Sequence, residues 1–330
     1  MERNKRIDVL KAIGIILVVA GHSGSPIRNY IYTFHMPLFF FISGFLRYGQ
    51  RDKKAKEFLK SKFKSIIIPY IVFWMVSMLL YNNVFYLITN GSIPDFGLNQ
   101  IKGLILGGKW LSSYSNNFPL WYLQLFFISI IVFELIIRIK KPRLTAFLTG
   151  MLVSLTVPFQ QLLPGRPIFH INVLPAAIVF LTIGYAFAYC LKEIKIIEKI
   201  TNNKCIGTIF IIVGWILASK NNGDISNIKS VIYFASASLT ILGIYTISEK
   251  LINNDFIIRI GSESLYILGL HILTIPYARP FSNYICNAVG LNNVFVNNFL
   301  IVTFSILICI GIIDLYRMTI NYIKEEFRNW

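Results

Sequence analysis

Histidine and lysine side chains interrupt the first two apolar runs of the sequence, in LKAIGIILVVAGHSGSPIRNYIYTFHMPLFFFISGFL from Leu10 to Leu46. Lys11 and His22 belong to the first run, and His35 opens the second. Because a helix turns about 100° per residue, Lys11 and His22 share a face, roughly 16 Å apart along the axis. Histidine is suited to acid–base chemistry near neutral pH. An ionisable residue within a membrane span is a functional hypothesis by default.

Each of these residues also has a structural interpretation. Lys11 can extend to the inner headgroups or pair with Asp8, three residues earlier. His22 can bond a loop carbonyl at the end of its helix. A metal site made of the four histidines is disfavoured, because no pair has the HxxxH or HExxH spacing of metal ligands. We therefore predict no metal.

The composition is that of a membrane protein. Hydrophobic residues make up 55% of the 330 residues and charged residues only 14%, where soluble proteins carry about 25%. Mean hydropathy is +0.62. The net charge of +17 would suggest nucleic acid in a soluble protein, but here no nucleic-acid partner is expected. The four cysteines have no CxxC spacing, which excludes a disulfide framework.

Ten apolar runs approach the length of about 20 residues that a membrane-spanning helix needs. They lie near 7–24, 29–47, 65–88, 119–138, 144–163, 170–191, 205–219, 229–249, 264–284 and 294–319. The segment 98–111 is an additional interfacial or re-entrant candidate, and 47–64 is predicted to form an amphipathic helix. We predict an all-α polytopic membrane helix bundle with about ten transmembrane helices. It would form one integral-membrane domain over 1–330, without a soluble extracytoplasmic domain.

The distribution of basic residues orients these spans. With a cytoplasmic N-terminus, the outer segments hold only Arg28, Lys102, Lys109, Arg166, Lys220, Lys229 and Arg279. Lys11 lies within the first span, and every other lysine and arginine falls on the inner side. The positive-inside rule therefore predicts that both termini are cytoplasmic. The charge excess is mainly topological, with anionic membrane lipids as its partner.

Acidic residues near the span ends have structural assignments. Glu134 is expected to pair with Arg138, and Asp314 with Arg317, at helical i, i+4 and i, i+3 spacings. Glu263 is expected to cap the helix of the ninth run. None of them is predicted to be catalytic.

Five segments together resemble the acyltransferase 3 family of membrane-bound acyltransferases. They are RIDVLKAIGIILVVAGH (6–22), FHMPLFFFISGFL (34–46), KSKFKSIIIPY (60–70), PLWYLQLFF (119–127) and IGSESLYILGLHIL (260–273). The chain is similar to the fucose-4-O-acetylase-like and polysaccharide O-acetyltransferase members. Lys11 and His22 match the family's Arg/Lys-X10-His element. The basic run before Pro69 holds lysines where the family often has arginines.

The resemblance implies an enzyme of the cell envelope, a multi-pass protein of the cytoplasmic (inner) membrane. It would transfer an acetyl (acyl) group from cytoplasmic acetyl-CoA to a hydroxyl of an extracytoplasmic or lipid-linked glycan. It implies that His22 is the catalytic histidine and that Lys11 is a donor-side cation.

The chemistry of acyl transfer extends these assignments. A general base must take the hydroxyl proton, and charge stabilisation must act on the oxyanion. His35 is a candidate second acid–base group. The predicted donor-phosphate contacts are Lys60, Lys62 and Lys64. The predicted acceptor contacts are Trp121, Tyr122 and His271. For the two aromatic residues, an interfacial aromatic belt is the structural alternative.

One alternative function stays open at this point, a membrane transporter or exporter of a sugar or modified oligosaccharide. It would predict inverted repeats and broken midplane helices, which the sequence does not display clearly. The acceptor sugar, the hydroxyl modified, the length of the acyl group and the formation of a homo-oligomer are not determined by the sequence.

Overall fold

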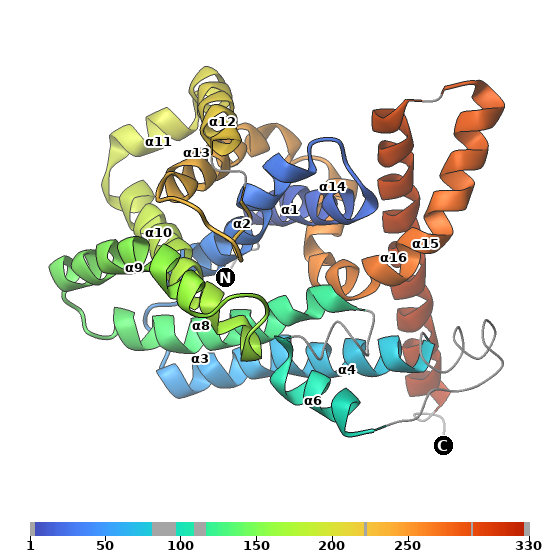
Figure 1. Ribbon diagram of the computed structural model, residues 1–330, viewed down its shortest axis with the longest axis horizontal. Coiled ribbons are helices and arrows are strands. Elements are labelled where there is room, and N and C mark those ends of the chain that lie inside the picture. The colour runs from blue at the N-terminus through green and yellow to red at the C-terminus, as the bar shows by residue number, and fades with distance from the viewer. Residues whose placement is uncertain (1–3, 81–96, 109–116, 221–222, 292, 327–330) are drawn as a thin grey trace. The chain divides into compact units, whose positions relative to one another are not determined.

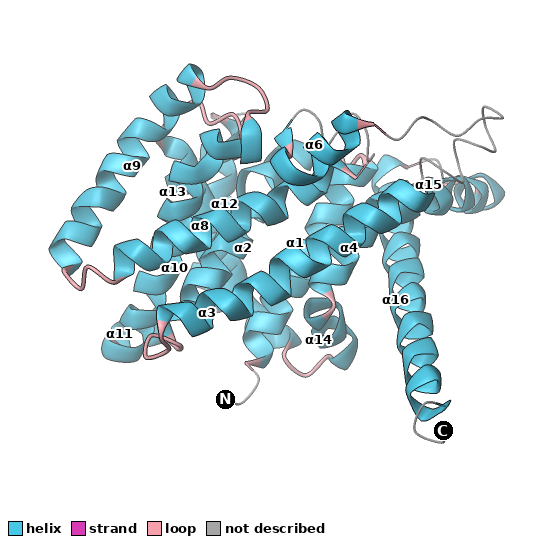
Figure 2. Cartoon of the chain, turned by 90° about the horizontal axis from the view of Figure 1, so that it is seen from below, coloured by secondary structure: helices cyan, strands magenta, loops and turns pink. Residues whose placement is uncertain are grey.

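The computed structural model describes residues 4–80, 97–108, 117–220, 223–291 and 293–326. Within these ranges the chain consists of helices and connecting loops, with no strand (Figure 2). The predicted all-α class is therefore confirmed. The short helix α6 (Leu98–Leu106) lies in the segment predicted to be interfacial or re-entrant; residues 109–111 of that segment lie outside the described ranges.

Each of the ten predicted apolar runs is helical over most of its described part. The elements other than α6 are α1 (Lys5–Ser23), α2 (Arg28–Tyr48), α3 (Ala55–Lys62), η1 (Phe63–Ile67), α4 (Ile68–Ser77), η3 (Phe118–Leu120), α8 (Trp121–Ile137), α9 (Pro142–Leu162), η4 (Ile168–Val173), α10 (Leu174–Glu193), α11 (Lys195–Thr201), α12 (Lys204–Ser219), α13 (Ile232–Ile247), η5 (Ser248–Leu251), α14 (Asp255–Ser262), α15 (Ser264–Val289) and α16 (Val294–Glu326) (Figure 1).

Several of these helices are long and apolar enough to cross a membrane, so the chain is a multi-pass integral membrane protein. Among the described residues, six helical segments meet this condition, or eight if two bent helix pairs each count as one span. The bends are 76° between α11 and α12 and 82° between α14 and α15. The predicted number of ten spans is not confirmed. Helix α1 is not among the candidates, because it holds four charged residues near its start, Lys5, Arg6, Asp8 and Lys11. Helix α2 is not among them either, because polar residues in its first turns lower its mean hydropathy.

The chain separates into two compact units. The first unit is Met1–Arg28 with Asn253–Trp330, and the second is Asn29–Ile252. A single domain over 1–330 stays a prediction, and each unit is described by itself.

In the first unit, α1 packs against α14, α15 and α16. Most of its apolar residues are buried, among them Leu10, Ile15 and Val19. Gly261 allows α14 to approach α1 closely, because a Cβ at this position would overlap the carbonyl group of Asp8. Helices α15 and α16 form a hairpin, in which the hydroxyls of Thr274 and Ser305 lie 2.6 Å apart. The helix that carries Lys11 and His22 is thus held on several sides.

The second unit contains the amphipathic segment and the spans that surround it. Of the predicted amphipathic helix over 47–64, only the part from Ala55 forms a separate helix, because α2 ends at Tyr48 and a loop follows it. In α3, Phe58 is buried whereas Lys60 is exposed, which is the predicted amphipathic pattern. Helix α8 packs along η1, which joins α3 to α4 (Figure 2). Helices α2 and α10 meet at two glycines, since a Cβ on Gly44 or Gly184 would overlap the backbone of the other helix. Small residues at such crossings allow close backbone contact within membranes.

Candidate functional site

His22 lies in the last turn of α1, a helix with a defined start and end. The Asn4 side chain accepts a hydrogen bond from the backbone N–H of Ile7 at the first turn. Gly24, with φ of 95°, ends the helix in the left-handed conformation that a residue without Cβ adopts most easily. His22 is half-buried, so its ring is partly accessible at the end of the helix.

The structure places the imidazole of His271 beside that of His22, within the first unit. The two ring centroids are 5.2 Å apart, with 35° between the ring planes. His271 is fully buried, and its Nδ1 lies 2.9 Å from the carbonyl oxygen of Leu268 and 3.2 Å from that of Ile267. A carbonyl only accepts, so Nδ1 carries the hydrogen. In the uncharged ring, Nε2 is then the acceptor.

A buried polar cluster holds the turn that follows His22. Asn298 of α16 donates from Nδ2 to the hydroxyl oxygen of Ser23 at 2.8 Å, and this hydroxyl donates to the carbonyl of Ala20 at 3.1 Å. Arg279 of α15 donates to the carbonyl of Ser23 at 3.4 Å. The sequence analysis did not assign Asn298 or Arg279 to the site, because their role depends on contacts between helices far apart in the chain.

Lys11 and Asp8 form an ion pair on α1, as their spacing predicts. Lys11 Nζ lies 3.2 Å from Asp8 Oδ1, with exposed side-chain fractions of 29% and 7%. Because α1 is continuous from Lys5 to Ser23, Lys11 and His22 lie on one helix, roughly 16 Å apart along its axis. The Lys11 side chain remains partly exposed beside its partner.

His35 belongs to the second unit and is buried in α2. Its Nδ1 donates to the carbonyl oxygen of Ile31 at 2.8 Å, one turn earlier on the same helix. Its ring centroid is 5.1 Å from that of Tyr32. These contacts fix the ring orientation. They leave Nε2 as the acceptor in the uncharged ring. These contacts do not test the predicted acid–base role of His35, which stays a prediction.

Trp121, at the start of α8, stacks on His170 of η4, with centroids 4.4 Å apart and 29° between the planes. His170 and Phe169 adopt φ of 50° and 54°, a left-handed conformation that is unusual for residues other than glycine. The sequence analysis did not assign His170, the first residue of the predicted span 170–191, to the site.

Tyr122 lies on the buried side of the same helix. It is 3% exposed and stacks on Phe126 with a centroid distance of 5.2 Å. Its hydroxyl group has no hydrogen-bond partner among the described residues. Tyr122 therefore packs in the core of the second unit, and only its hydroxyl is left for a predicted acceptor contact.

The predicted donor lysines lie on and just after α3. Lys60 and Lys64 are exposed, and Lys62 is half-buried with its Nζ 5.4 Å from the centroid of the Phe58 ring. Lys64 lies in the π-helical segment η1, which precedes Pro69 in α4. The described side chains thus include accessible ammonium groups on the segment predicted to be cytoplasmic.

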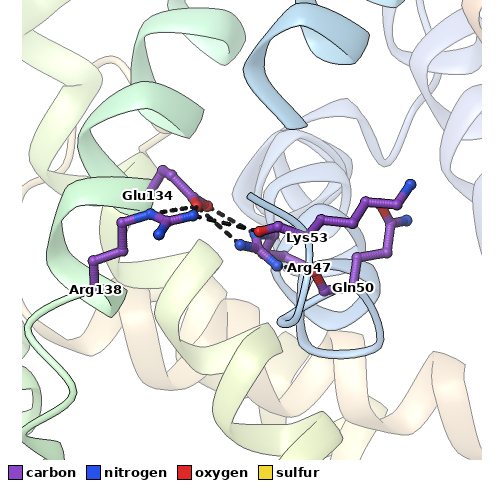
Figure 3. A network of polar contacts seen from close by, with 5 residues as sticks. All are labelled: Arg47, Gln50, Lys53, Glu134 and Arg138. Atoms are coloured by element: carbon purple, nitrogen blue, oxygen red, sulfur yellow. Dashed lines mark hydrogen bonds and ion pairs between the residues drawn. The ribbon is translucent and has the colours of Figure 1, made fainter. Parts of the chain in front are cut away.

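A buried ion-pair network connects the end of α2, which precedes the loop into α3, to the end of α8 (Figure 3). Arg47 binds both carboxylate oxygens of Glu134, at 2.7 and 2.9 Å. Arg138 binds Glu134 at 2.8 Å, which confirms the predicted i, i+4 pair. Arg47 also donates to the carbonyl of Gln50, and Arg138 to that of Lys53 at 3.4 Å. The network therefore ties the loop that leads into α3.

The predicted pair of Asp314 with Arg317 is wrong. Asp314 pairs with Arg259 of α14, and Arg317 pairs at 2.7 Å with Glu263. Glu263 occupies the N-cap position of α15, as predicted, but its side chain makes no hydrogen bond to the first turn of that helix. Both α16 side chains therefore pair outside their own helix, Asp314 with α14 and Arg317 with Glu263 at the junction of α14 and α15.

The described residues contain no group of three or more histidine, cysteine or acidic side chains placed to hold a metal ion. The clusters that the structure brings together are instead an imidazole pair, basic side chains and aromatic rings. These groups can move protons, bind phosphates and contact a sugar ring, respectively.

Comparison with known proteins identifies the family. The sequence profile described as an acyltransferase domain matches residues 4–316, which is nearly the whole chain. Neither the search of curated proteins nor the search of solved structures found a match. The matched range contains His22, His271 and every other predicted site residue. The chain therefore belongs to the acyltransferase 3 family, and it is a membrane acyltransferase.

Proposed function

We propose that this acyltransferase moves an acetyl (acyl) group from cytoplasmic acetyl-CoA to a hydroxyl of an extracytoplasmic or lipid-linked glycan. The hydroxyl oxygen attacks the thioester carbonyl, the new C–O bond forms and the C–S bond breaks. The proton passes from the hydroxyl to the base and then to the thiolate of coenzyme A. In this proposal the protein is an O-acetyltransferase of the cell envelope, and it lies in the cytoplasmic membrane.

The observation that carries this proposal is the pairing of His22 with His271. In the proposal, His22 is the general base, because its ring is half-buried at the end of α1. His271 is fully buried, and its Nδ1 is fixed on two backbone carbonyls. It orients the ring of His22 and supports it while it holds the proton. A base held by a second oriented group is the usual arrangement for activating a hydroxyl nucleophile.

The donor would bind at the cytoplasmic side. Lys60, Lys62 and Lys64 are proposed to bind the phosphates of coenzyme A, since ammonium–phosphate contacts are charge-assisted. Within the first unit, the partly exposed Lys11 is proposed to contact the pantetheine arm on its way toward His22. The axial separation of roughly 16 Å between these residues suits a long, thin arm better than a site where phosphates and base lie at one level.

The acceptor would bind at the extracytoplasmic side. Trp121, with His170 stacked on one face, is proposed to pack against a sugar ring, and the Tyr122 hydroxyl to bond a sugar hydroxyl. His271 would contact the acceptor through its place beside His22. His35 is retained as a second proposed acid–base group. No observation on the described residues favours the transporter alternative.

Inside-out vesicles test the proposal when radiolabelled acetyl-CoA is added to the medium outside them. The vesicle exterior is then the cytoplasmic face, and label should appear on glycan in the lumen. His22→Ala should lower the transfer rate about 10²- to 10⁴-fold, the usual contribution of a general base. Thr208→Ala, at an exposed position of α12, is the control. Transfer at the normal rate by a well-inserted His22→Ala protein would overturn the assignment of the base.

His271→Asn and His271→Ala separate the positioning role from simple packing. Asparagine can keep a hydrogen bond to the carbonyls of Ile267 and Leu268, but it removes the second ring nitrogen. If His271 orients the base, both variants should lower the rate and change its dependence on pH. Unchanged pH profiles with a lower amount of folded protein would mean that His271 only packs the bundle.

A further inference from the structure

A pocket of about 330 Å³ lies in the first unit, where the end of α15 meets the beginning of α16. Its lining residues are Asn283, Cys286, Asn287, Leu291, Asn293, Val294 and Asn297. The volume is at the small end of the range for ligand pockets, about 300–1,000 Å³. It suits one compact ligand unit.

The lining chemistry points to a neutral, hydroxylated ligand. Four of the lining residues carry a carboxamide, which can both donate and accept hydrogen bonds. None of the lining residues is charged. The side chains of Leu291 and Val294 add an apolar surface for C–H groups. Hydroxyl groups beside a C–H face are the features of a sugar ring.

Hydrogen bonds fix the positions of several of these asparagines. Asn297 donates from Nδ2 to Oδ1 of Asn283 at 2.9 Å, and so joins α16 to α15. Asn293 accepts from the backbone N–H of Phe295 at 2.8 Å, at the first turn of α16. Ser282 donates to the carbonyl of Asn297 at 3.0 Å. The walls of the pocket are therefore ordered before a ligand arrives, while the Asn287 side chain is exposed.

The pocket lies at the same end of this unit as the turn that follows His22. Ser23 is bonded to Arg279, one helical turn before Asn283, and to Asn298, which follows Asn297. In α15, Asn283 comes 12 residues after His271, a rise of roughly 18 Å along an ideal helix. A ligand in the pocket would thus lie beyond the histidine pair, on the side predicted to be extracytoplasmic.

We propose that this asparagine pocket is an acceptor subsite, which binds a neutral sugar unit of the glycan beyond the one that is acylated. The inference rests on the proposed function, because it assigns the pocket to the glycan acceptor. Recognition of a second sugar unit would select oligosaccharides over single sugars.

Acetyl transfer to paired acceptors tests the subsite. The probes are a panel of neutral methyl glycosides and the corresponding di-, tri- and tetrasaccharides, with radiolabelled acetyl-CoA as donor. We expect the wild-type protein to have a lower KM for an oligosaccharide long enough to reach the pocket than for its single sugar. Asn287→Ala and Asn283→Ala should each lower this ratio of KM values about two- to tenfold, as expected for one or two neutral hydrogen bonds. The donor KM should not change.

Asn202→Ala is the matched control, since Asn202 is an exposed asparagine at the end of α11 in the other unit. Asn287→Ala is the more informative variant, because Asn283 also closes the helical hairpin. An unchanged preference for the longer oligosaccharides in a folded Asn287→Ala protein would overturn the subsite and leave the proposed function intact.

Direct binding separates the two proposals further. Saturation-transfer NMR on the purified protein without donor should detect the neutral disaccharides, and the signal should fall in Asn287→Ala. The corresponding uronic-acid disaccharides should bind more weakly, since the pocket offers no cation. Equal signals from wild type and Asn287→Ala would refute the subsite even if no transfer occurred, whereas binding without transfer would refute only the proposed reaction.

Discussion

Replacing Glu134 with glutamine should strongly destabilise the second unit. Glu134 is 1% exposed and is the shared acceptor for Arg47 and Arg138 (Figure 3). The side chain of Arg47 is only 3% exposed, so without the carboxylate it becomes a buried charge with no opposite charge beside it. Removing one partner of a buried ion pair costs about 3–5 kcal/mol. Glutamine can still accept one hydrogen bond, which places the expected loss near the lower value.

Arg138→Gln is the matched control, because it removes a partner of the same carboxylate from an exposed position. The Arg138 side chain is 43% exposed, and exposed ion pairs contribute about 0–1 kcal/mol. The double variant Arg47→Leu with Glu134→Leu removes both buried charges. It should be less destabilised than Glu134→Gln, since replacing a whole buried pair by apolar residues is often neutral.

Equilibrium unfolding in mixed detergent micelles, followed by circular dichroism, measures these differences. The decisive quantity is the difference in unfolding free energy between Glu134→Gln and Arg138→Gln, expected to be about 2 kcal/mol or more. Equal losses below about 1 kcal/mol for both variants would refute the reasoning. The network also ties Gln50 and Lys53, so Glu134→Gln should increase proteolysis of the loop before α3.

Three further predictions concern packing and binding. Gly261→Val should lower the melting temperature and the transfer rate, because the valine side chain would overlap the Asp8 backbone and move α14 away from α1. The control is Gly150→Val, at a position where a Cβ meets no atom within 4 Å. Equal melting temperatures of the two variants would contradict the packing argument. Tyr122→Phe should keep or raise the unfolding free energy by about 1 kcal/mol, because the buried hydroxyl has no partner among the described residues; a higher acceptor KM in the same variant would support its predicted contact with the sugar. Alanine at Lys60, Lys62 and Lys64 should raise the donor KM about two- to fivefold for each residue, and less at high salt; a donor KM that ignores both the substitutions and the salt would exclude these lysines from the phosphate site.

The sequence alone determined the class of the protein and the positions of most helices. Apolar runs of this length have few alternatives in a membrane, where backbone groups must bond within the segment. Local spacing also predicted contacts within one helix, as with Lys11 and Asp8 or Glu134 and Arg138. The family resemblance depended on ordered motifs, and the matched profile confirms it.

The tertiary structure decided which distant residues meet. Arg47 reaches Glu134 across 87 positions, and Asp314 takes Arg259 in place of the nearby Arg317. These partners follow from how helices cross, which residue spacing within one helix does not contain.

The same limit applies to the candidate site. The spacing of Lys11 and His22 follows from helical geometry, whereas the approach of His271 to His22 needs the bend between α14 and α15 and the packing of α15 on α1. The asparagine pocket likewise exists only where two helices join. Helical periodicity is a property of neighbouring residues, and it determines each face; a site assembled from several faces depends on the packing of side chains between helices.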